Sequence, residues 1–424
     1  MEVTVLAFNA NGNPRRLAVL ETWTRTLILK VKLLNSSKRR CCNLLEWYFS
    51  STSLALCVMC LGCAKDDQLP ETSEFRTFAL GFTNFPHDGT PAGVTAALNV
   101  IRNDGDLLVA HFDNGIPWDA ALVNNFSQYP QDFRDEINFL VAARPSGHKL
   151  YLAVTPIAFL RNRLAPTRGP NGQQTFLAPW SGYAFDHPDV ITAFINHCRI
   201  MINQFNPDFF TFGIEVNLVH EVAGDSIWRS YPSFAAAVYT SLRASYPGLP
   251  LIQSLQADSY YRNPTVQSGV IQQIIPYTDY IAISTYPFGD AVRYPHQSQA
   301  NPAFLPASFF SMLADLAPNK PFAVAETVWP AEDVSSPYPV EIRSNESYQH
   351  LYVNALLNAS NSLRAKFVCW FFTRDYDDFW NSTLSSDPNA ALIRLCKDTG
   401  LYRGDGTSRP ALIYWHSFLN RQRL

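Results

Sequence analysis

Two glutamates stand at the ends of two strand-like segments, Glu215 in DFFTFGIEVN and Glu326 in PFAVAETVWP. Each glutamate follows a stretch of apolar and small residues and precedes a polar or aromatic loop. A carboxylate is costly to place at the end of a buried strand, so two such placements indicate chemistry. A pair of carboxylates can divide the work of a nucleophile and a general acid/base, as cleavage of a glycosidic bond requires.

The other segment ends carry amides, carboxylates and aromatic rings rather than a metal-binding cluster. Neither H-E-x-x-H nor G-x-S-x-G occurs, so a zinc protease and a serine hydrolase are not indicated. The aspartates of TRDYDDFW, Asp375, Asp377 and Asp378, lack the spacing of an EF-hand and predict a solvated loop. We expect no metal and no cofactor.

Eight short apolar runs recur from Phe78 onward and could hold these residues in place. The intervals between runs are mostly about 30 to 45 residues, the length of a strand plus a crossover helix. The runs cover residues 78–83, 107–112, 149–154, 209–215, 250–254, 280–285, 321–326 and 367–372.

Because most of these runs are apolar throughout, they predict a parallel sheet covered by helices on its faces. Eight strand–helix units predict an α/β fold of the (β/α)8 TIM barrel type. A doubly wound open sheet is the alternative, although no G-x-G-x-x-G or P-loop follows the first run. In a TIM barrel, reactive side chains lie at the carboxyl ends of the strands, where both glutamates fall.

The segments between the runs have helical spacing. Residues 186–205 place Val190, Phe194, Cys198, Met201 and Phe205 on one face. A second helix is predicted to begin after Asn345 as its cap, and a third within residues 301–321. The long connection at 155–187 predicts a substrate loop at the top of the barrel.

The composition of the 424-residue chain favours a neutral ligand. Charged residues make up only 16% of the chain, and the net charge is -3. No stripe of lysine and arginine crosses the body of the chain, so nucleic-acid binding is not expected. The 9 Trp, 19 Tyr and 29 Phe offer rings on which sugars can stack, although an aromatic core would have the same composition.

The N-terminal region has the order of an export signal. A basic start at residues 38–40 precedes an apolar stretch at 53–62, which is too short to span a membrane. A buried helix is the alternative reading of that stretch. LGC before AKDD resembles a bacterial lipoprotein processing site with Cys63 as the lipidated residue. We predict an extension and signal at 1–63, a polar linker at 64–77 and a catalytic barrel domain at 78–424.

The motifs in the barrel region resemble those of clan-A glycoside hydrolases, a superfamily of retaining TIM-barrel enzymes. AETVWP is similar to the nucleophile motif of endo-β-1,3-glucanases, and ISTYPF is similar to the sixth strand of endo-β-1,4-galactanases. The closing segment GLYRGDGTSRPALIYWHSF resembles the final loop and helix of several clan members. The likeness covers roughly residues 78 to 420.

The resemblance implies an acid/base glutamate at the end of strand four and a nucleophile at the end of strand seven. Counting the runs assigns these roles to Glu215 and Glu326. It also implies a two-step displacement with retention, for which the two carboxyl groups should lie about 5–5.5 Å apart. Taken singly, either glutamate could instead cap a helix or pair with an arginine.

The resemblance further implies substrate-binding residues. Tyr286 is expected to hydrogen-bond Glu326, and Trp329 and Trp370 are expected to form stacking walls for a sugar ring. Trp370 matches the usual sugar-platform tryptophan of strand eight. Tyr286 and Trp370 could also simply fill the mouth of the barrel.

Two positions depart from the pattern of the clan. An asparagine that binds the sugar 2-hydroxyl usually stands directly before the acid/base glutamate, where this chain has Ile214. Asn217 is the candidate to take a similar position. The arginine of strand two is absent, and His111 stands at the corresponding strand end.

These features lead to one main hypothesis and two alternatives. The main hypothesis is an exported, monomeric retaining glycoside hydrolase that cleaves a β-linked polysaccharide or oligosaccharide. Its contact with a bacterial membrane would be only through a lipid on Cys63; otherwise it would be secreted. The departures at Ile214 and His111 favour a non-catalytic carbohydrate-binding lipoprotein on a degenerate barrel. A TIM-barrel hydrolase or lyase that uses one glutamate as a base is the third reading.

Overall fold

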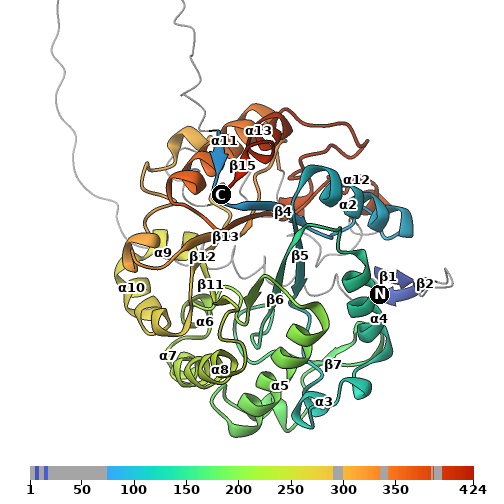
Figure 1. Cartoon of the computed structure of the whole chain (residues 1–424), viewed down its shortest axis with the longest axis vertical. Coiled ribbons are helices and arrows are strands. Elements are labelled where there is room, and N and C mark those ends of the chain that lie inside the picture. Colours follow the sequence, from blue (N-terminus) through green and yellow to red (C-terminus); the bar gives the residue numbers. More distant parts are fainter. Residues whose placement is uncertain are drawn as a thin grey trace, which may run out of the picture.

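A ring of parallel strands forms the centre of the molecule, and helices surround it (Figure 1). Every strand of this ring lies within or next to one of the eight apolar runs. The strands are β4 (Ala79–Thr83), β5 (Leu107–Phe112), β6 (Lys149–Val154), β9 (Phe209–Thr211), β10 (Leu251–Ile252), β11 (Ser254–Gln256), β12 (Ile281–Thr285), β13 (Phe322–Thr327) and β14 (Phe367–Trp370). The TIM barrel predicted from the sequence is therefore confirmed.

Strand five closes the barrel in two pieces. The sheet runs in the order β10-β9-β6-β5-β4-β14-β13-β12-β11, so its two ends, β10 and β11, are neighbours in the sequence. Only Gln253 separates them, and its amide reaches the Tyr277 carbonyl (2.8 Å) while accepting from the Tyr231 hydroxyl (2.9 Å). β10 pairs with β9 and β11 with β12, which completes the ring.

Side chains of alternating strand positions fill the interior of the barrel. Small residues such as Ala79, Ala153 and Ala282 share this space with larger ones such as Tyr151 and Phe367. Gly81 is required here because a Cβ at its position would lie 1.9 Å from the Leu107 carbonyl oxygen of the neighbouring strand. The opposite faces of the strands pack against the helices.

The helices that follow the strands cover the outside of the barrel (Figure 1). The α-helices are α2 (Pro91–Asp104), α3 (Trp118–Leu122), α4 (Gln131–Ala143), α5 (Pro188–Phe205), α6 (Leu218–Ala223), α7 (Asp225–Trp228), α8 (Tyr231–Ser245), α9 (Ala257–Arg262), α10 (Pro264–Gln272), α11 (Glu346–Ser362), α12 (Asp377–Ser382) and α13 (Ala411–Leu419). Short 3-10 helices are η1 (Phe126–Gln128), η2 (Pro170–Gly172), η3 (Trp180–Gly182), η4 (Ile275–Tyr277), η5 (Pro302–Phe304) and η6 (Ala314–Leu316). Among the described residues, no helix is long and apolar enough to cross a membrane.

Two of the three predicted helices are confirmed. The apolar stripe of residues 186–205 lies on α5, and Asn345 caps α11 by accepting from the Tyr348 amide (2.9 Å). The helix predicted within 301–321 is wrong, because this segment consists of turns and the short helices η5 and η6. Pro306 lies inside the segment and has no N–H to donate, which is incompatible with a continuous helix.

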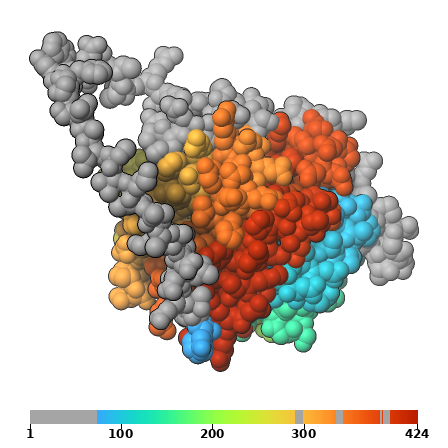
Figure 2. Space-filling model, turned by 90° about the horizontal axis from the view of Figure 1, so that it is seen from above, coloured from blue at the N-terminus to red at the C-terminus, as the bar shows by residue number. Residues whose placement is uncertain are grey.

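The two ends of the barrel domain meet beside each other. β3 (Phe75–Arg76), at the end of the predicted linker, pairs with β15 (Gln422–Arg423). The buried Arg76 binds the Asp106 carboxylate (2.8 Å) and so ties this pair to the start of β5. The C-terminal segment lies along the first barrel elements (Figure 2), with the Trp415 ring 4.8 Å from that of Phe82.

The computed structural model describes residues 74–289, 299–334, 342–382, 385 and 394–424. It also gives the backbone of a two-stranded antiparallel sheet, β1 (Val5–Phe8) and β2 (Pro14–Leu17). The predicted signal sequence, Cys63 and residues 64–73 of the linker lie outside the described residues.

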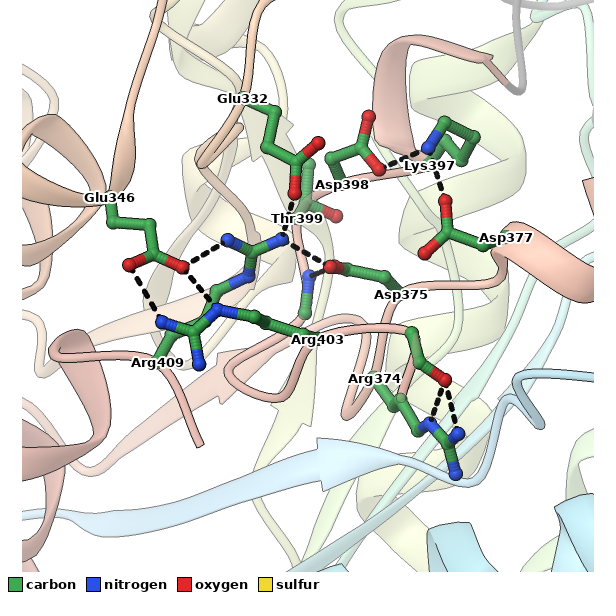
Figure 3. Close-up of polar contacts among 12 residues, drawn as sticks. Glu332, Glu346, Arg374, Asp375, Asp377, Lys397, Asp398, Thr399, Arg403 and Arg409 are labelled. Atoms are coloured by element: carbon green, nitrogen blue, oxygen red, sulfur yellow. Dashed lines mark hydrogen bonds and ion pairs between the residues drawn. The ribbon is translucent and has the colours of Figure 1, made fainter. Parts of the chain in front are cut away.

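An ion network centred on the buried Arg409 joins the loop after β14 to the last part of the chain (Figure 3). The Arg409 guanidinium donates to Glu332 (2.8 Å), to Glu346 (2.6 Å) and to Asp375. Asp375 is only 1% exposed, so the solvated loop predicted from TRDYDDFW is wrong at this residue. The reason is that Arg409, distant in the sequence, compensates the buried charge.

The same network contains three carboxylates at the spacing of a cation site. Oxygens of Glu332, Asp375 and Asp398 lie within 4.8 Å of one another. Arg409 binds two of these groups, and Lys397 binds Asp398 (Figure 3). The positive charge that a metal would bring is therefore already supplied by side chains.

We expect Arg409→Met to destabilise the protein by about 3–5 kcal/mol, because it leaves the Asp375 carboxylate buried without its partner. Arg403 is the matched control, since it also binds Glu346 but is 37% exposed. Arg403→Met should cost less than about 1 kcal/mol. Urea unfolding of the three proteins measures the difference, and equal losses in both variants would contradict the role given to Arg409.

Candidate active site

Glu326 faces the barrel interior because β13 contains a β-bulge. The pairing of β13 with β12 shifts between Ile283 and Ser284, and the pairing with β14 shifts between Val324 and Thr327. Ala325 faces the interior, whereas the Thr327 hydroxyl lies on the outer face, 2.6 Å from the Tyr352 hydroxyl of α11. An extra residue in a strand re-aims the side chains around it, which allows Glu326 to follow Ala325 inward.

Two side chains from other strands hold the Glu326 carboxylate. His111 Nε2 lies 3.1 Å from Oε1, and the Tyr286 hydroxyl donates to Oε2 at 2.8 Å. His111 faces inward through simple alternation along β5, because Leu107 and Val109 of that strand are also interior residues. The predicted hydrogen bond between Tyr286 and Glu326 is present in the structure.

Charge and hydrogen bonding keep Glu326 ionised. Burial alone raises its pKa, but the charge and hydrogen bond of His111, the Tyr286 hydroxyl and Arg161 together lower the pKa to about 2. Burial lowers the pKa of His111, while the Glu326 charge and hydrogen bond outweigh this and raise it above 6.5. The two groups therefore form a carboxylate–imidazolium pair below neutral pH.

Glu215 lies on a tight turn just beyond β9. Its backbone has a φ of 50°, a left-handed conformation that is uncommon for a non-glycine residue and strained. The Glu215 amide donates to the Ser254 hydroxyl on strand five (2.9 Å), which helps to fix this turn. Gly213 is needed before it, since a Cβ there would lie 2.5 Å from the Tyr231 hydroxyl oxygen.

Arg161 links the carboxylates of the site. It comes from the loop after β6, and its Nε and Nη2 donate to Glu215 Oε2 at 3.3 and 3.2 Å. Its Nη1 lies 2.8 Å from Asp113 Oδ2. Burial lowers the pKa of Arg161, but the charges of Asp113, Glu215 and Glu326 reverse this shift and raise the pKa. Both glutamates thus lie within the electrostatic reach of one buried guanidinium.

Sequence reasoning did not identify Arg161 as a site residue. It lies in the segment FLRNRLAP of the predicted substrate loop, and nothing in its spacing shows which arginine turns inward. Asp113, in contrast, follows His111 by two positions, and side chains two residues apart along a strand point to the same face. Alternation along strand two therefore indicates Asp113 together with His111 at the end of this strand.

The side chain of Asn217 bonds to strand five and to α10. Its amide nitrogen donates to the Gln256 carbonyl (3.2 Å) and to the Gln267 side chain (2.9 Å), and its oxygen accepts from the Gln256 amide (2.8 Å). These bonds join the turn after Glu215 to strand five and α10. A substrate-binding role for Asn217 stays a prediction.

The two candidate tryptophans are completely buried. The Trp329 ring stacks on Tyr352 of α11 with centroids 4.5 Å apart, and Trp370 donates its indole N–H to the Thr399 carbonyl (3.0 Å). Trp370 belongs to the outer, helix-facing core, whereas Cys369 of the same strand faces the barrel interior. The next ring, Phe371, lies 5.3 Å from His111. Sugar stacking on Trp329 or Trp370 stays a prediction.

Ile214 packs with the interior residues of the barrel. Its side chain is 0% exposed, and its amide donates to the Thr155 hydroxyl (3.3 Å). The position that would carry a polar amide in the clan therefore closes the top of the apolar interior in this chain.

Comparisons with known proteins identify the fold. No protein-family model and no curated protein matches the chain. A solved GH5_18 structure from Bifidobacterium longum subsp. longum, in complex with Manb1-4GlcNAc, has a TM-score of 0.56 at 14% identity and covers 81% of this chain and 78% of that one. A GH5_18 protein from Streptomyces cattleya with the same ligand has a TM-score of 0.52 at 14% identity, covering 81% and 80%.

A third solved structure, the catalytic core of xylanase A, has a TM-score of 0.52 at 13% identity and covers 81% of this chain and 98% of that one. Identities this low show the arrangement of the strands and helices, and fold alone does not assign an activity. The chain has the TIM-barrel fold of these structures.

Proposed function

We propose that the protein is a retaining glycoside hydrolase that acts on a β-linked polysaccharide or oligosaccharide. One observation carries the proposal: the buried, ionised Glu326 of strand seven and Glu215, which follows strand four, lie at one barrel mouth, where Arg161 binds Glu215 and its charge also lowers the pKa of Glu326. A carboxylate pair in this position matches the needs of a double displacement.

In the first step, Glu326 attacks the anomeric carbon while the bond to the leaving oxygen breaks. This step requires Glu215 in its protonated form. Glu215 gives that proton to the leaving oxygen, so the leaving group departs as an alcohol and Glu215 becomes a carboxylate. In the second step, Glu215 takes a proton from water, which attacks the same carbon and releases Glu326. Two inversions give a product with the original anomeric configuration.

The residues that touch the glutamates hold them ready for this reaction. The Tyr286 hydroxyl and His111 fix both oxygens of Glu326 before substrate arrives. Arg161 binds Asp113 and donates two hydrogen bonds to Glu215, which fixes the position of the Glu215 side chain. Such preorganisation lowers the cost of reaching the transition state.

A neutral sugar is the substrate class with the best support. The GH5_18 structures contain Manb1-4GlcNAc, and the other similar structure is a xylanase core. The chain is also poor in charge and rich in aromatic residues. We therefore place Manβ1-4GlcNAc, mannan, xylan, β-glucan and galactan first in a substrate screen.

We also propose export and lipid attachment at Cys63, based on the basic start, the apolar stretch and the LGC sequence that precede AKDD. Expression in a bacterial host with a labelled lipid precursor should label the wild type and Cys60→Ser but not Cys63→Ser. A mature chain that still begins at Met1 would contradict this proposal.

Glu326→Gln should lower kcat on any hydrolysed substrate by about 10³-fold or more, because the nucleophile is lost. Glu215→Gln should lower it by about 10²–10⁴-fold on natural substrates. On an aryl glycoside whose leaving group needs no proton, Glu215→Ala should keep the first step and gain turnover from added azide.

Glu136→Gln is the control for these two changes, since Glu136 also pairs with a buried arginine, Arg168 (2.8 Å), but lies on α4 outside the barrel. The activity of Glu136→Gln should stay near that of the wild type. Activity that survives both active-site changes would reject the assignments. Sugar binding without hydrolysis in the wild type would instead support a degenerate, carbohydrate-binding barrel.

The His111–Glu326 pair should make stability depend on pH. Glu326 has a lowered pKa and stabilises the fold above about pH 4.5, an effect lost as the pH falls towards 2. His111 has a raised pKa and stabilises the fold below 6.5, an effect lost as the pH rises through that pKa. Urea unfolding should show that the free energy of unfolding of the wild type falls as the pH rises through the pKa of His111, and that His111→Gln lacks this decline. The half-buried His350, on α11, is the control, and His350→Gln should keep the decline.

A further inference from the structure

A cavity of about 250 Å³ lies in the long connection between β6 and α5, beside the start of α8. One wall comes from the hairpin and loop that follow β6, with Arg163, Phe176, Leu177 and Tyr183. The opposite wall contains Ile227 of α7 and Ser230, which directly precedes α8. Nothing in the reaction steps above uses this cavity.

One wall of the cavity and Arg161, which binds Glu215, belong to the same hairpin. The Ala158 amide donates to the Arg163 carbonyl (2.9 Å), and Ile157 pairs with Leu164. Arg161 lies at the tip of this hairpin and binds Glu215, while Arg163, two residues later, lines the cavity. The cavity therefore adjoins the hairpin that positions Glu215.

The opposite wall is also tied to the site. Tyr231, the residue after Ser230, donates to Gln253 of strand five, and its hydroxyl lies against Gly213 of the turn that carries Glu215. Each wall therefore belongs to a segment that also contacts the surroundings of Glu215: the hairpin through Arg161, and the start of α8 through Tyr231.

The lining has the chemistry that binds a neutral sugar ring. Phe176, Leu177 and Ile227 are 46%, 59% and 38% exposed, so the rim presents apolar surface to solvent. Serine hydroxyls lie among these residues, and the Arg163 guanidinium stacks on Phe176 at 4.8 Å. Pyranose rings combine apolar C–H faces with hydroxyl edges and are matched by such a lining.

The floor of the cavity is rigid. Trp180 lines it and is 4% exposed, and its indole N–H donates to Asp119 (2.7 Å). The other side of its ring stacks on Trp118 at 5.3 Å. A ring fixed in this way can contact a ligand without losing much conformational entropy.

We propose that this cavity is a sugar subsite for the leaving-group end of an extended substrate, an inference that rests on the proposed function. The leaving group departs towards the acid/base residue, and the cavity adjoins the hairpin that positions Glu215. Its volume is below the ~300–1,000 Å³ of pockets that enclose drug-sized ligands, so it holds one ring rather than a whole chain. The protein then prefers oligosaccharides that reach past the cleavage point.

The test compares a long substrate with a short one, using the full-length protein. Leu177→Ala combined with Phe176→Ala should lower kcat/KM about tenfold on a long oligosaccharide of the hydrolysed type. The same variant should leave kcat/KM unchanged on the corresponding glycosyl fluoride, whose leaving group is too small to reach the cavity. Ile413→Ala, which removes an apolar side chain 69% exposed on α13, is the control and should change neither value. Equal losses on both substrates, or no loss on either, would overturn the proposal.

A binding experiment separates this inference from the proposed function. Calorimetry with long β-linked oligosaccharides of mannose and of xylose and full-length Glu326→Gln should show binding of one of them that weakens about tenfold when Phe176 and Leu177 are also changed. This measurement does not need turnover, so it holds even if the wild type hydrolyses nothing in the screen. Absent binding, or binding that the cavity changes leave intact, would overturn the subsite.

Discussion

The burial of three carboxylates at one barrel mouth is the constraint on which the site depends. Asp113, Glu215 and Glu326 are each less than 10% exposed, and charges so placed require compensation. Arg161 supplies it to Asp113 and Glu215, and His111 supplies it to Glu326. Removing either cation would leave uncompensated charge among apolar neighbours. The loop after strand three and the end of strand two are thereby fixed relative to the glutamates.

The backbone accepts local irregularity to satisfy this constraint. A bulge in β13 turns Glu326 inward, and a left-handed turn after β9 brings Glu215 towards Arg161. Both irregularities lie near the carboxyl ends of the strands, and the pairing of β13 with β14 resumes at Thr327 after its bulge. The lower interior, packed with residues such as Ala153 and Phe367, keeps its alternation and can hold these ends rigid.

The barrel and part of the site could be predicted from the sequence, because they depend on local patterns. Apolar runs predict strands because their burial is a local property, and alternation places His111 on the inner face. Trp370, however, follows that same alternation to the outer face, and a motif match alone cannot show this. Arg161 and Arg409 could not be predicted, because each side chain is placed by partners distant in the sequence.

Ile214 is a clear difference between this site and the pattern that the sequence resembles. Its burial in the barrel interior withdraws a polar group from the position next to Glu215. The Phe371 ring, 5.3 Å from His111, cannot form strong hydrogen bonds. His111, Asn217 and Tyr286 stay the candidate polar contacts for a substrate. Arg161 belongs to the long loop after β6 and binds Glu215, so a change in that loop alters the surroundings of this glutamate.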